Sequence, residues 1–383
     1  MQSLHRQCYA ASQQRRAVTP PVLTLLRPCR AASCRDTSYE GSVPKSVQFS
    51  VDGVVPFLPH GIAAPIQAPL NARPIVILPG FGNCTQDYEA PFGQSSDSLA
   101  ANLRSRGWAV HVVRLERSDW FQVARALFTL KFWSSQLSTE PGYTWYLDRV
   151  QEAVQLALQA SGAQQVDLVG HSAGGWLARA YIGDPRYQGE PAASATAQPC
   201  PNPAVRALVT LGSPQKPPPP ELARDMTGGA LAWVHDRYPG AFFADQGVAY
   251  VTVAGLTVKG GRQLDAQGRP VQVKGRPRLP SEYAYDSYGQ VCGLGQGVEG
   301  DAVVPLNSAC LQGARQVLLP GVWHSVSKIG TFDEASGVVW YGSGAVVDAW
   351  LQPYVQEAYP QAGAAVDIVD KMSATGVGSS VSS

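Results

Sequence analysis

A serine stands at the centre of a glycine-rich turn, in the sequence Gly-His-Ser-Ala-Gly-Gly at residues 170–175. A mostly apolar run, Val-Asp-Leu-Val at 166–169, precedes the turn, and a stretch of helical character follows it. A strand–turn–helix context of this kind exposes the serine hydroxyl, and the glycines let neighbouring backbone approach closely. The first amides of the helix favour negative charge that develops there. We therefore predict that Ser172 is a catalytic nucleophile; an ordinary glycine-rich turn is the alternative.

A serine hydroxyl needs a base to take its proton before it can attack a substrate. For a turn of this kind the base follows the nucleophile along the chain, after the last strand. Four of the six histidines precede Ser172, and His235 lies in an aromatic segment. His324 comes shortly after Leu-Leu-Pro-Gly at 318–321, which has the pattern of a strand end and a turn. Its position predicts that His324 is the base.

The third group of such a site is a carboxylate that holds the imidazole in the right tautomer and stabilises its charged form. Asp301, in Gly-Asp-Ala-Val-Val-Pro at 300–305, lies between Ser172 and His324 and begins a short apolar run. We predict that Asp301 is this acid. The alternatives in the same window are Glu299, Asp286 and Asp265, of which Asp265 has the setting of a hairpin turn.

Acyl transfer also needs two backbone N–H groups that stabilise the oxyanion. One is expected from Ala173, the residue after the nucleophile. The other is expected from the loop after an early strand, where Leu-Pro-Gly-Phe-Gly-Asn occupies residues 78–83. Glycines permit the backbone angles that turn an amide toward the serine, and Phe81 is the predicted donor. A plain strand-ending turn is the alternative.

Short apolar runs alternate with helical patterns along most of the chain. The predicted strands are 74–78, 109–113, 165–170, 204–211, 248–254 and 317–319, with a further strand or hairpin over 47–57. The predicted helices are 98–106, 145–160 and 178–182. In the helix over 145–160, one stripe is formed by Leu147, Val150, Val154 and Leu158. The alternation predicts an α/β fold, with a mostly parallel sheet and helices on both of its faces.

The composition suits one large globular domain with tails: 383 residues, 45% apolar and 15% charged, with a net charge of +1. The balanced charge argues against a nucleic-acid partner, and no apolar run is long enough for a membrane-spanning helix. We expect the domain over residues 46–365, a flexible tail over 366–383, and inserts at about 183–203, 214–247 and 256–300. The last insert is expected to begin with a surface hairpin over 256–278.

Residues 1–45 differ in composition from the rest of the chain. Six arginines precede the first acid, Asp36, and Gln, Ala and Ser fill much of the segment. This composition is typical of an organellar transit peptide, and we favour a chloroplast over a mitochondrion; an untargeted tail is the alternative. Three of the seven cysteines lie here, and the spacing of the others matches no zinc or redox motif. We therefore predict free thiols, with a disulfide as the alternative.

The motifs at 78–82, 170–175 and 300–305, followed by Trp-His-Ser at 323–325, resemble those of the lipase and esterase branch of the α/β-hydrolase superfamily. The resemblance covers about residues 46–365 and is greatest to plant and algal plastid members related to GPI inositol-deacylase-like lipases. It implies an α/β-hydrolase fold with a lid-like insert. It also implies a triad of Ser172, Asp301 and His324, with Phe81 and Ala173 as oxyanion donors. One departure is Pro79-Gly80, where many members have His-Gly, and this bears on the donor at Phe81.

The predicted reaction is the hydrolysis of a carboxylic ester, in which neither a metal nor an organic cofactor is required. Residues 117–134 are dense in aromatic and aliphatic side chains, including Trp120 and Phe121, and Trp233 adds to them further along. Apolar surface near a catalytic serine suits a fatty acyl chain, so we predict a lipid ester as substrate and Trp120, Phe121 and Trp233 as substrate contacts. Such a surface would also suit peripheral contact with a membrane. The alternative for these residues is a place in core helices.

Two other functions are compatible with the same motifs. The nucleophile could serve a thioesterase or an acyltransferase, because both proceed through an acyl-enzyme. The fold could also form a ligand receptor with little turnover, although a pure binder has no need of all three catalytic groups.

Overall fold

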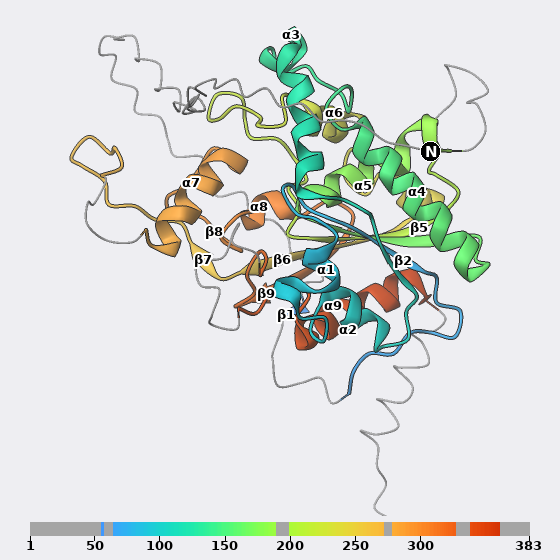
Figure 1. Cartoon of the computed structure of the whole chain (residues 1–383). Coiled ribbons are helices and arrows are strands. Elements are labelled where there is room, and N and C mark those ends of the chain that lie inside the picture. Colours follow the sequence, from blue (N-terminus) through green and yellow to red (C-terminus); the bar gives the residue numbers. More distant parts are fainter. Residues whose placement is uncertain (1–54, 57–63, 189–198, 272–277, 327–337, 361–383) are drawn as a thin grey trace, which may run out of the picture. The chain divides into compact units, whose positions relative to one another are not determined.

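The short apolar runs form the central sheet of the fold (Figure 1). Its strands are β1 (Val55–Pro56), β2 (Ile75–Leu78), β3 (Val110–Val112), β4 (Val166–His171), β5 (Val205–Leu211), β6 (Ala249–Leu256) and β9 (Arg315–Pro320). Their order across the sheet is β1-β9-β6-β5-β4-β2-β3, and every neighbouring pair is parallel. All residues of β2 and β4 are buried, as expected for strands covered on both faces. The predicted parallel sheet is confirmed.

This computed structural model describes residues 55–56, 64–188, 199–271, 278–326 and 338–360. All of them belong to one compact unit, Val51–Ser383. The predicted targeting segment 1–45, the predicted tail 366–383 and most of the strand predicted over 47–57 lie outside the described residues. No helix in these ranges is long and apolar enough to span a bilayer.

Helices cover the two faces of the sheet because successive strand side chains point to opposite sides. Val76 and Leu168 belong to one apolar cluster, together with residues of α4, α5 and α6. Ile77 and Val169 belong to a second cluster, together with residues of α2 and α9. The helices of the first cluster are α4 (Thr144–Ser161), α5 (Ala173–Gly183) and α6 (Ala230–Arg237). Those of the second cluster are α2 (Leu99–Arg104) and α9 (Gly344–Ala358). Figure 1 shows the two sets on opposite sides of the strands.

Local sequence signals explain where the predicted helices begin and end. The Ser98 side chain accepts a hydrogen bond from the N–H of Ala101 at 3.0 Å and so caps the start of α2. Gly162 ends α4 in the left-handed conformation with φ of 69°, which glycine adopts without steric penalty. The remaining helices are α1 (Gln86–Glu89), α3 (Leu130–Trp133), α7 (Pro280–Cys292) and α8 (Leu306–Ala309), with 3₁₀ segments η1 (Pro91–Gly93), η2 (Arg117–Phe128), η3 (Pro185–Tyr187) and η4 (Ala244–Gln246).

The surface hairpin predicted over 256–278 is present but shorter than expected. Leu264 bridges antiparallel to Pro270, and the N–H of Val271 donates to the carbonyl of Gln263 at 2.8 Å. The preceding strand β7 (Val258–Lys259) does not join this hairpin but pairs antiparallel with β8 (Glu299–Gly300), and α7 lies between them in sequence. This pairing was not predicted because the partner of β7 comes from beyond α7 and leaves no local signal.

A buried polar network fastens the start of β4 to the C-terminal helix. Asp167 accepts hydrogen bonds from Arg73 at 2.8 Å, from the Tyr354 hydroxyl at 2.5 Å and from the Tyr359 hydroxyl at 2.8 Å. Burial raises the pKa of Tyr354, which keeps its hydroxyl protonated and able to donate. A buried carboxylate is stable only when it is paired and hydrogen-bonded in this way. The network therefore fixes the strand that carries Ser172 at its other end.

Candidate active site

Ser172 occupies the sharp turn between β4 and α5. Its φ of 52° and ψ of −123° lie outside the regions that residues with a Cβ normally adopt. Its N–H donates to the carbonyl of Leu211 in β5 at 2.9 Å, which holds the turn to the next strand. The following helix packs so closely that a Cβ added to Gly175 would lie 2.0 Å from the Ser213 hydroxyl. This is the strained strand–turn–helix geometry that the sequence predicts for a nucleophile.

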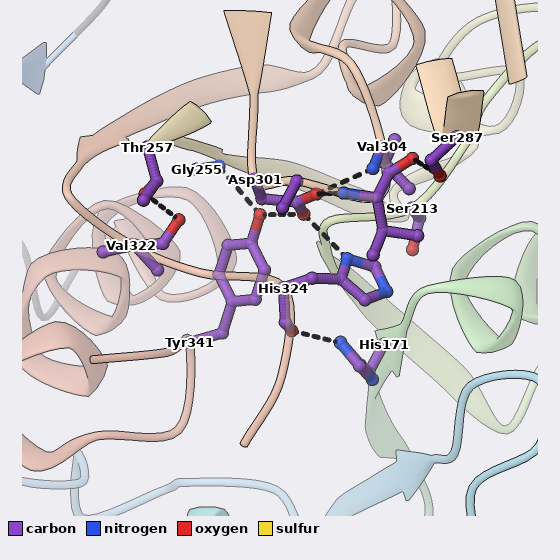
Figure 2. Close-up of polar contacts among 12 residues, drawn as sticks. His171, Ser213, Gly255, Thr257, Ser287, Asp301, Val304, Val322, His324 and Tyr341 are labelled. Atoms are coloured by element: carbon purple, nitrogen blue, oxygen red, sulfur yellow. Dashed lines mark hydrogen bonds and ion pairs between the residues drawn. The ribbon is translucent and has the colours of Figure 1, made fainter. Parts of the chain in front are cut away.

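Asp301 and His324 are in direct contact, although they follow different strands. Asp301 comes after β8 and His324 after β9, and both are buried. The His324 Nδ1 lies 2.8 Å from the Asp301 Oδ2. The His324 N–H also donates to the carbonyl of Asp301 at 3.0 Å, so the backbones are joined as well. Figure 2 shows the carboxylate of Asp301 between the ring of His324 and that of Tyr341.

Four donors converge on the Asp301 carboxylate. Its Oδ1 accepts the N–H groups of Val303 at 3.0 Å and Val304 at 2.7 Å. Its Oδ2 accepts the Tyr341 hydroxyl at 2.7 Å in addition to His324. Burial alone would raise the pKa of Asp301, but His324 and these hydrogen bonds outweigh it and lower that pKa below its usual value. Asp301 is therefore ionised and acts only as an acceptor.

The hydrogen bonds around Asp301 fix the tautomer of His324. The Tyr341 hydroxyl accepts the N–H of Gly255 at 2.7 Å and donates its single proton to Asp301. Because Asp301 only accepts, the bond to His324 requires a proton on Nδ1. The neutral ring then presents an unprotonated Nε2, which is the atom that a general base needs.

The other acids of the predicted window have different partners in the described part of the chain. Glu299 forms an ion pair with Lys259 at 3.6 Å. Asp286 pairs with two arginines, and Asp265 accepts backbone N–H groups of its own turn. Of the four candidates, Asp301 is the one that contacts the imidazole.

His171 makes a contact that the sequence analysis did not predict. Its Nε2 lies 2.8 Å from the carbonyl of His324, and its Nδ1 lies 2.7 Å from the Tyr88 hydroxyl. That hydroxyl also accepts the N–H of Gly80 at 2.9 Å and the side-chain amide of Asn83 at 3.0 Å. The Tyr88 proton therefore goes to His171, whose own proton on Nε2 is donated to His324. The signal for this residue in the sequence is its position next to the serine, inside the glycine-rich turn.

The neutral state of His171 follows from its surroundings. Burial lowers its pKa to about 3, and the nearby His324 adds to this effect. The two rings lie 4.8 Å apart between centroids. A Cβ added to Gly80 would lie 2.7 Å from the Cβ of Ser172, so the loop that contains Gly80 rests against the serine turn. Through the Tyr88 hydroxyl and His171, this loop is thus connected to the backbone of His324.

The loop at residues 79–83 is held from two sides. The Tyr146 hydroxyl in α4 donates to the carbonyl of Pro79 at 2.7 Å, while the Gly80 N–H is taken by Tyr88. Within the described ranges, no hydrogen bond engages the N–H of Phe81 or of Ala173. The role of these two amides as oxyanion donors stays a prediction.

The aromatic residues predicted to contact substrate occupy different environments. The exposed ring of Phe81 packs at 5.0 Å against Trp120, which is only 6% exposed and belongs to the core. The next residue, Phe121, is 79% exposed. Trp233 is half-buried in α6 and packs against the core cluster. Trp120 therefore supports the loop at residues 79–83 from inside the protein, and the substrate contacts of all three residues stay predictions.

The described residues contain no cluster of three or more His, Cys, Asp or Glu side chains that could hold a metal ion. Four cysteines lie in the described ranges, and all four are free: Cys84, Cys200, Cys292 and Cys310. The predicted free thiols are thus confirmed for these four; Cys84 and Cys292 are buried, whereas Cys200 is exposed.

The profile of the alpha/beta hydrolase family matches residues 75–329, well over half of the chain. The chain belongs to the alpha/beta hydrolase family. The matched span begins at β2 and includes Ser172, Asp301 and His324. No curated protein matches this alpha/beta hydrolase in sequence.

Several solved structures are similar to this alpha/beta hydrolase, all at low identity. A putative lipase from Sulfolobus solfataricus is 16% identical, with 37% of each chain covered and a TM-score of 0.24. The mature lipase BlEst2 from Bacillus licheniformis is 14% identical over 76% of this chain and 94% of that one, with a TM-score of 0.37. The phospholipase PlaB from Legionella pneumophila is 14% identical over 78% of this chain and 63% of that one, with a TM-score of 0.40. The resemblance to plastid lipases stays a prediction.

Proposed function

We propose that this alpha/beta hydrolase cleaves carboxylic esters through an acyl-enzyme on Ser172, with His324 as base and Asp301 as the supporting acid. The observation that carries the proposal is the buried 2.8 Å contact between Asp301 and His324, whose ring lies 4.8 Å from that of His171, the residue before the strained Ser172. An ionised carboxylate, an oriented imidazole and a serine hydroxyl on a strained turn are the parts of a serine hydrolase.

The reaction takes place in two steps. In the first, the Ser172 hydroxyl attacks the ester carbonyl and its proton passes to Nε2 of His324. The tetrahedral oxyanion accepts hydrogen bonds from the N–H groups of Phe81 and Ala173. His324 then protonates the leaving alcohol as the C–O bond breaks, which leaves the acyl group on Ser172. In the second step His324 deprotonates water, which attacks the acyl group and releases the acid with the serine restored.

Asp301 stabilises the imidazolium that forms in both steps. Its charge is held by four hydrogen bonds, so it can oppose the new positive charge without taking the proton itself. Tyr341 keeps the carboxylate directed at His324, because its hydroxyl is in turn held by the N–H of Gly255. The barrier is lowered because these groups are already oriented before the reaction.

We further propose that the substrate is a lipid acyl ester. Phe81, the proposed oxyanion donor, has an exposed ring, and the exposed Phe121 follows the tryptophan on which that ring packs. Apolar side chains beside the reacting serine would bind an acyl chain, because binding removes apolar surface of both from water. The composition of residues 1–45 supports a plastid location, which a fluorescent fusion of that segment would test.

A fluorophosphonate probe tests the nucleophile on the full chain. We expect the wild-type protein to be labelled, Ser172→Ala to be unlabelled, and Ser213→Ala, which alters a buried serine beside the same turn, to keep its label. Labelling that persists in Ser172→Ala would refute the assignment. Turnover of a series of esters of increasing acyl length then tests the substrate: activity confined to short soluble esters would exclude a lipid.

A further inference from the structure

A group of apolar side chains is exposed at the end of η2, in residues 127–133, here called the α3 spur. Phe128 is 90% exposed, Leu130 is 89% exposed and Trp133 is 59% exposed. Figure 1 shows α3 at the end of the η2 segment that lies away from the strands of the sheet. Single exposed apolar residues are ordinary, but several large ones together on one short element mark an interaction surface.

The spur has a defined structure of its own. The Thr129 side chain accepts the N–H of Phe132 at 3.2 Å and caps α3. The indole N–H of Trp133 donates to the carbonyl of Leu127 at 2.9 Å, and the rings of Phe132 and Trp133 pack edge to face at 5.4 Å. The exposed side chains are therefore presented on an ordered turn, which lowers the entropy lost when they bind.

The charges around the spur are mostly positive. From residue 120 to residue 139 the chain has no Asp or Glu, whereas Arg125 and Lys131 are both exposed. Arg224, from a neighbouring loop, lies 4.9 Å over the ring of Phe132 and donates to its carbonyl at 2.6 Å. The same loop has two acids: Asp225 is buried on backbone N–H groups, and Glu221 is exposed. The three cations, Arg125, Lys131 and Arg224, outnumber the one exposed acid, Glu221, so the surface is positively charged.

The neighbouring loop also extends the apolar surface. Leu222 and Met226 are both exposed, on either side of Arg224. The loop is tied to the spur's base, because the N–H of Leu137 donates to the carbonyl of Gly228 at 3.0 Å. Apolar and cationic side chains therefore alternate over two adjoining segments.

We propose that the α3 spur docks on a bilayer that contains anionic phospholipid. Phe128 and Leu130 would enter the acyl region, Trp133 would lie at the interface, and Lys131 with Arg125 would bind lipid phosphates. A second copy of this chain fits the surface less well, because a two-fold contact would set these cations against their own copies without carboxylates to oppose them. Docking at this position would bring the bilayer to η2, whose Trp120 supports Phe81.

Sedimentation with lipid vesicles tests the proposal on the full chain carrying Ser172→Ala, so that the lipids stay intact. The vesicles are phosphatidylcholine alone, or phosphatidylcholine and phosphatidylglycerol in equal parts. We expect Phe128→Ala with Leu130→Ala to lower partitioning by about tenfold or more, since full burial of one such side chain is worth about that factor. Leu70→Ala, which truncates a fully exposed leucine in the loop before β2, should have no effect.

Charge reversal separates the two parts of the surface. Lys131→Glu should lower binding to the anionic vesicles by about tenfold and leave binding to phosphatidylcholine alone nearly unchanged. Unchanged partitioning of the double variant, or an equal loss in Leu70→Ala, would overturn the proposal. So would a wild-type dimer that the double variant converts to a monomer, because the spur would then bind a second copy. Since Ser172→Ala is used throughout, failure of the proposed ester hydrolysis would leave this result unaffected.

Discussion

Replacing Tyr88 with phenylalanine would remove one oxygen atom that three groups of the site share. The ring and its packing would remain, but the N–H of Gly80, the amide of Asn83 and the Nδ1 of His171 would lose their partner. Gly80 lies in the loop at residues 79–83, and His171 donates to the carbonyl of His324, so this one hydroxyl connects the loop with the His324 backbone. The substitution therefore separates two halves of the site without altering a residue proposed to act in the reaction.

The size of the effect follows from the burial of these groups. Each buried polar group left unpaired destabilises by about 1–3 kcal/mol. Tyr88 is fully buried, so water reaches the gap only if the loop moves. With partial relaxation we expect a loss of about 3 kcal/mol in the free energy of unfolding. If the loop shift misplaces one oxyanion donor, kcat should fall by about 10²-fold, with little change in KM because the interaction is made in the transition state.

Urea unfolding and steady-state ester hydrolysis measure the two effects separately. Tyr354→Phe is the matched control, because it removes another buried hydroxyl, on Asp167 at the opposite end of β4. The control should lose stability and keep kcat. A folded Tyr88→Phe variant whose kcat stays within about twofold of wild type would refute the connection, as would an equal loss of kcat in Tyr354→Phe.

Two further predictions follow from Asp301 and His171. In Asp301→Asn an amide N–H would meet the Nδ1–H of His324, so the ring would adopt the other tautomer and kcat should fall by about 10⁴-fold. A loss of less than about tenfold, measured on protein with an unchanged circular dichroism spectrum, would contradict the assigned tautomer. His171 has a pKa of about 3 when folded, against about 6.5 when unfolded, so only the unfolded chain takes up its proton as the pH falls between these values. Stability should therefore be fully present above pH 6.5 or so and decline by about 1 kcal/mol per pH unit below it. Urea unfolding from pH 7 to pH 5 would show this slope, and His171→Gln should flatten it; equal slopes would exclude His171 as the cause.

Local patterns were sufficient to predict the parts of the site that depend on neighbouring residues. The serine turn needs an apolar strand, small residues and a helix in immediate succession, and all three are adjacent in the sequence. The order of Ser172, Asp301 and His324 along the chain then allowed the acid and the base to be chosen among few candidates. Their contact in the structure joins the turn after β8, in the small two-stranded sheet, to the turn after β9, in the central sheet, and the pairing that places β8 was not predicted.

The residues that were missed are those brought in from far along the chain. Tyr88 reaches His171 across 83 residues and Tyr341 reaches Asp301 across 40, and no spacing rule joins such pairs. The sequence also did not predict which of Trp120 and Phe121 is buried. Composition shows that both are apolar but not which one faces the core. By contrast, α9 could have been predicted: Val347, Trp350, Leu351 and Tyr354 form a buried stripe, with Pro353 as the misleading residue.

The attachment of Asp167 to the last helix has a consequence during synthesis of the protein. Two of its three partners, Tyr354 and Tyr359, are among the last residues of the domain to leave the ribosome. Until they emerge, Arg73 is the one of these three partners that can bind the Asp167 carboxylate. The strand that leads to Ser172 should thus be secured late, after the rest of the domain has been translated.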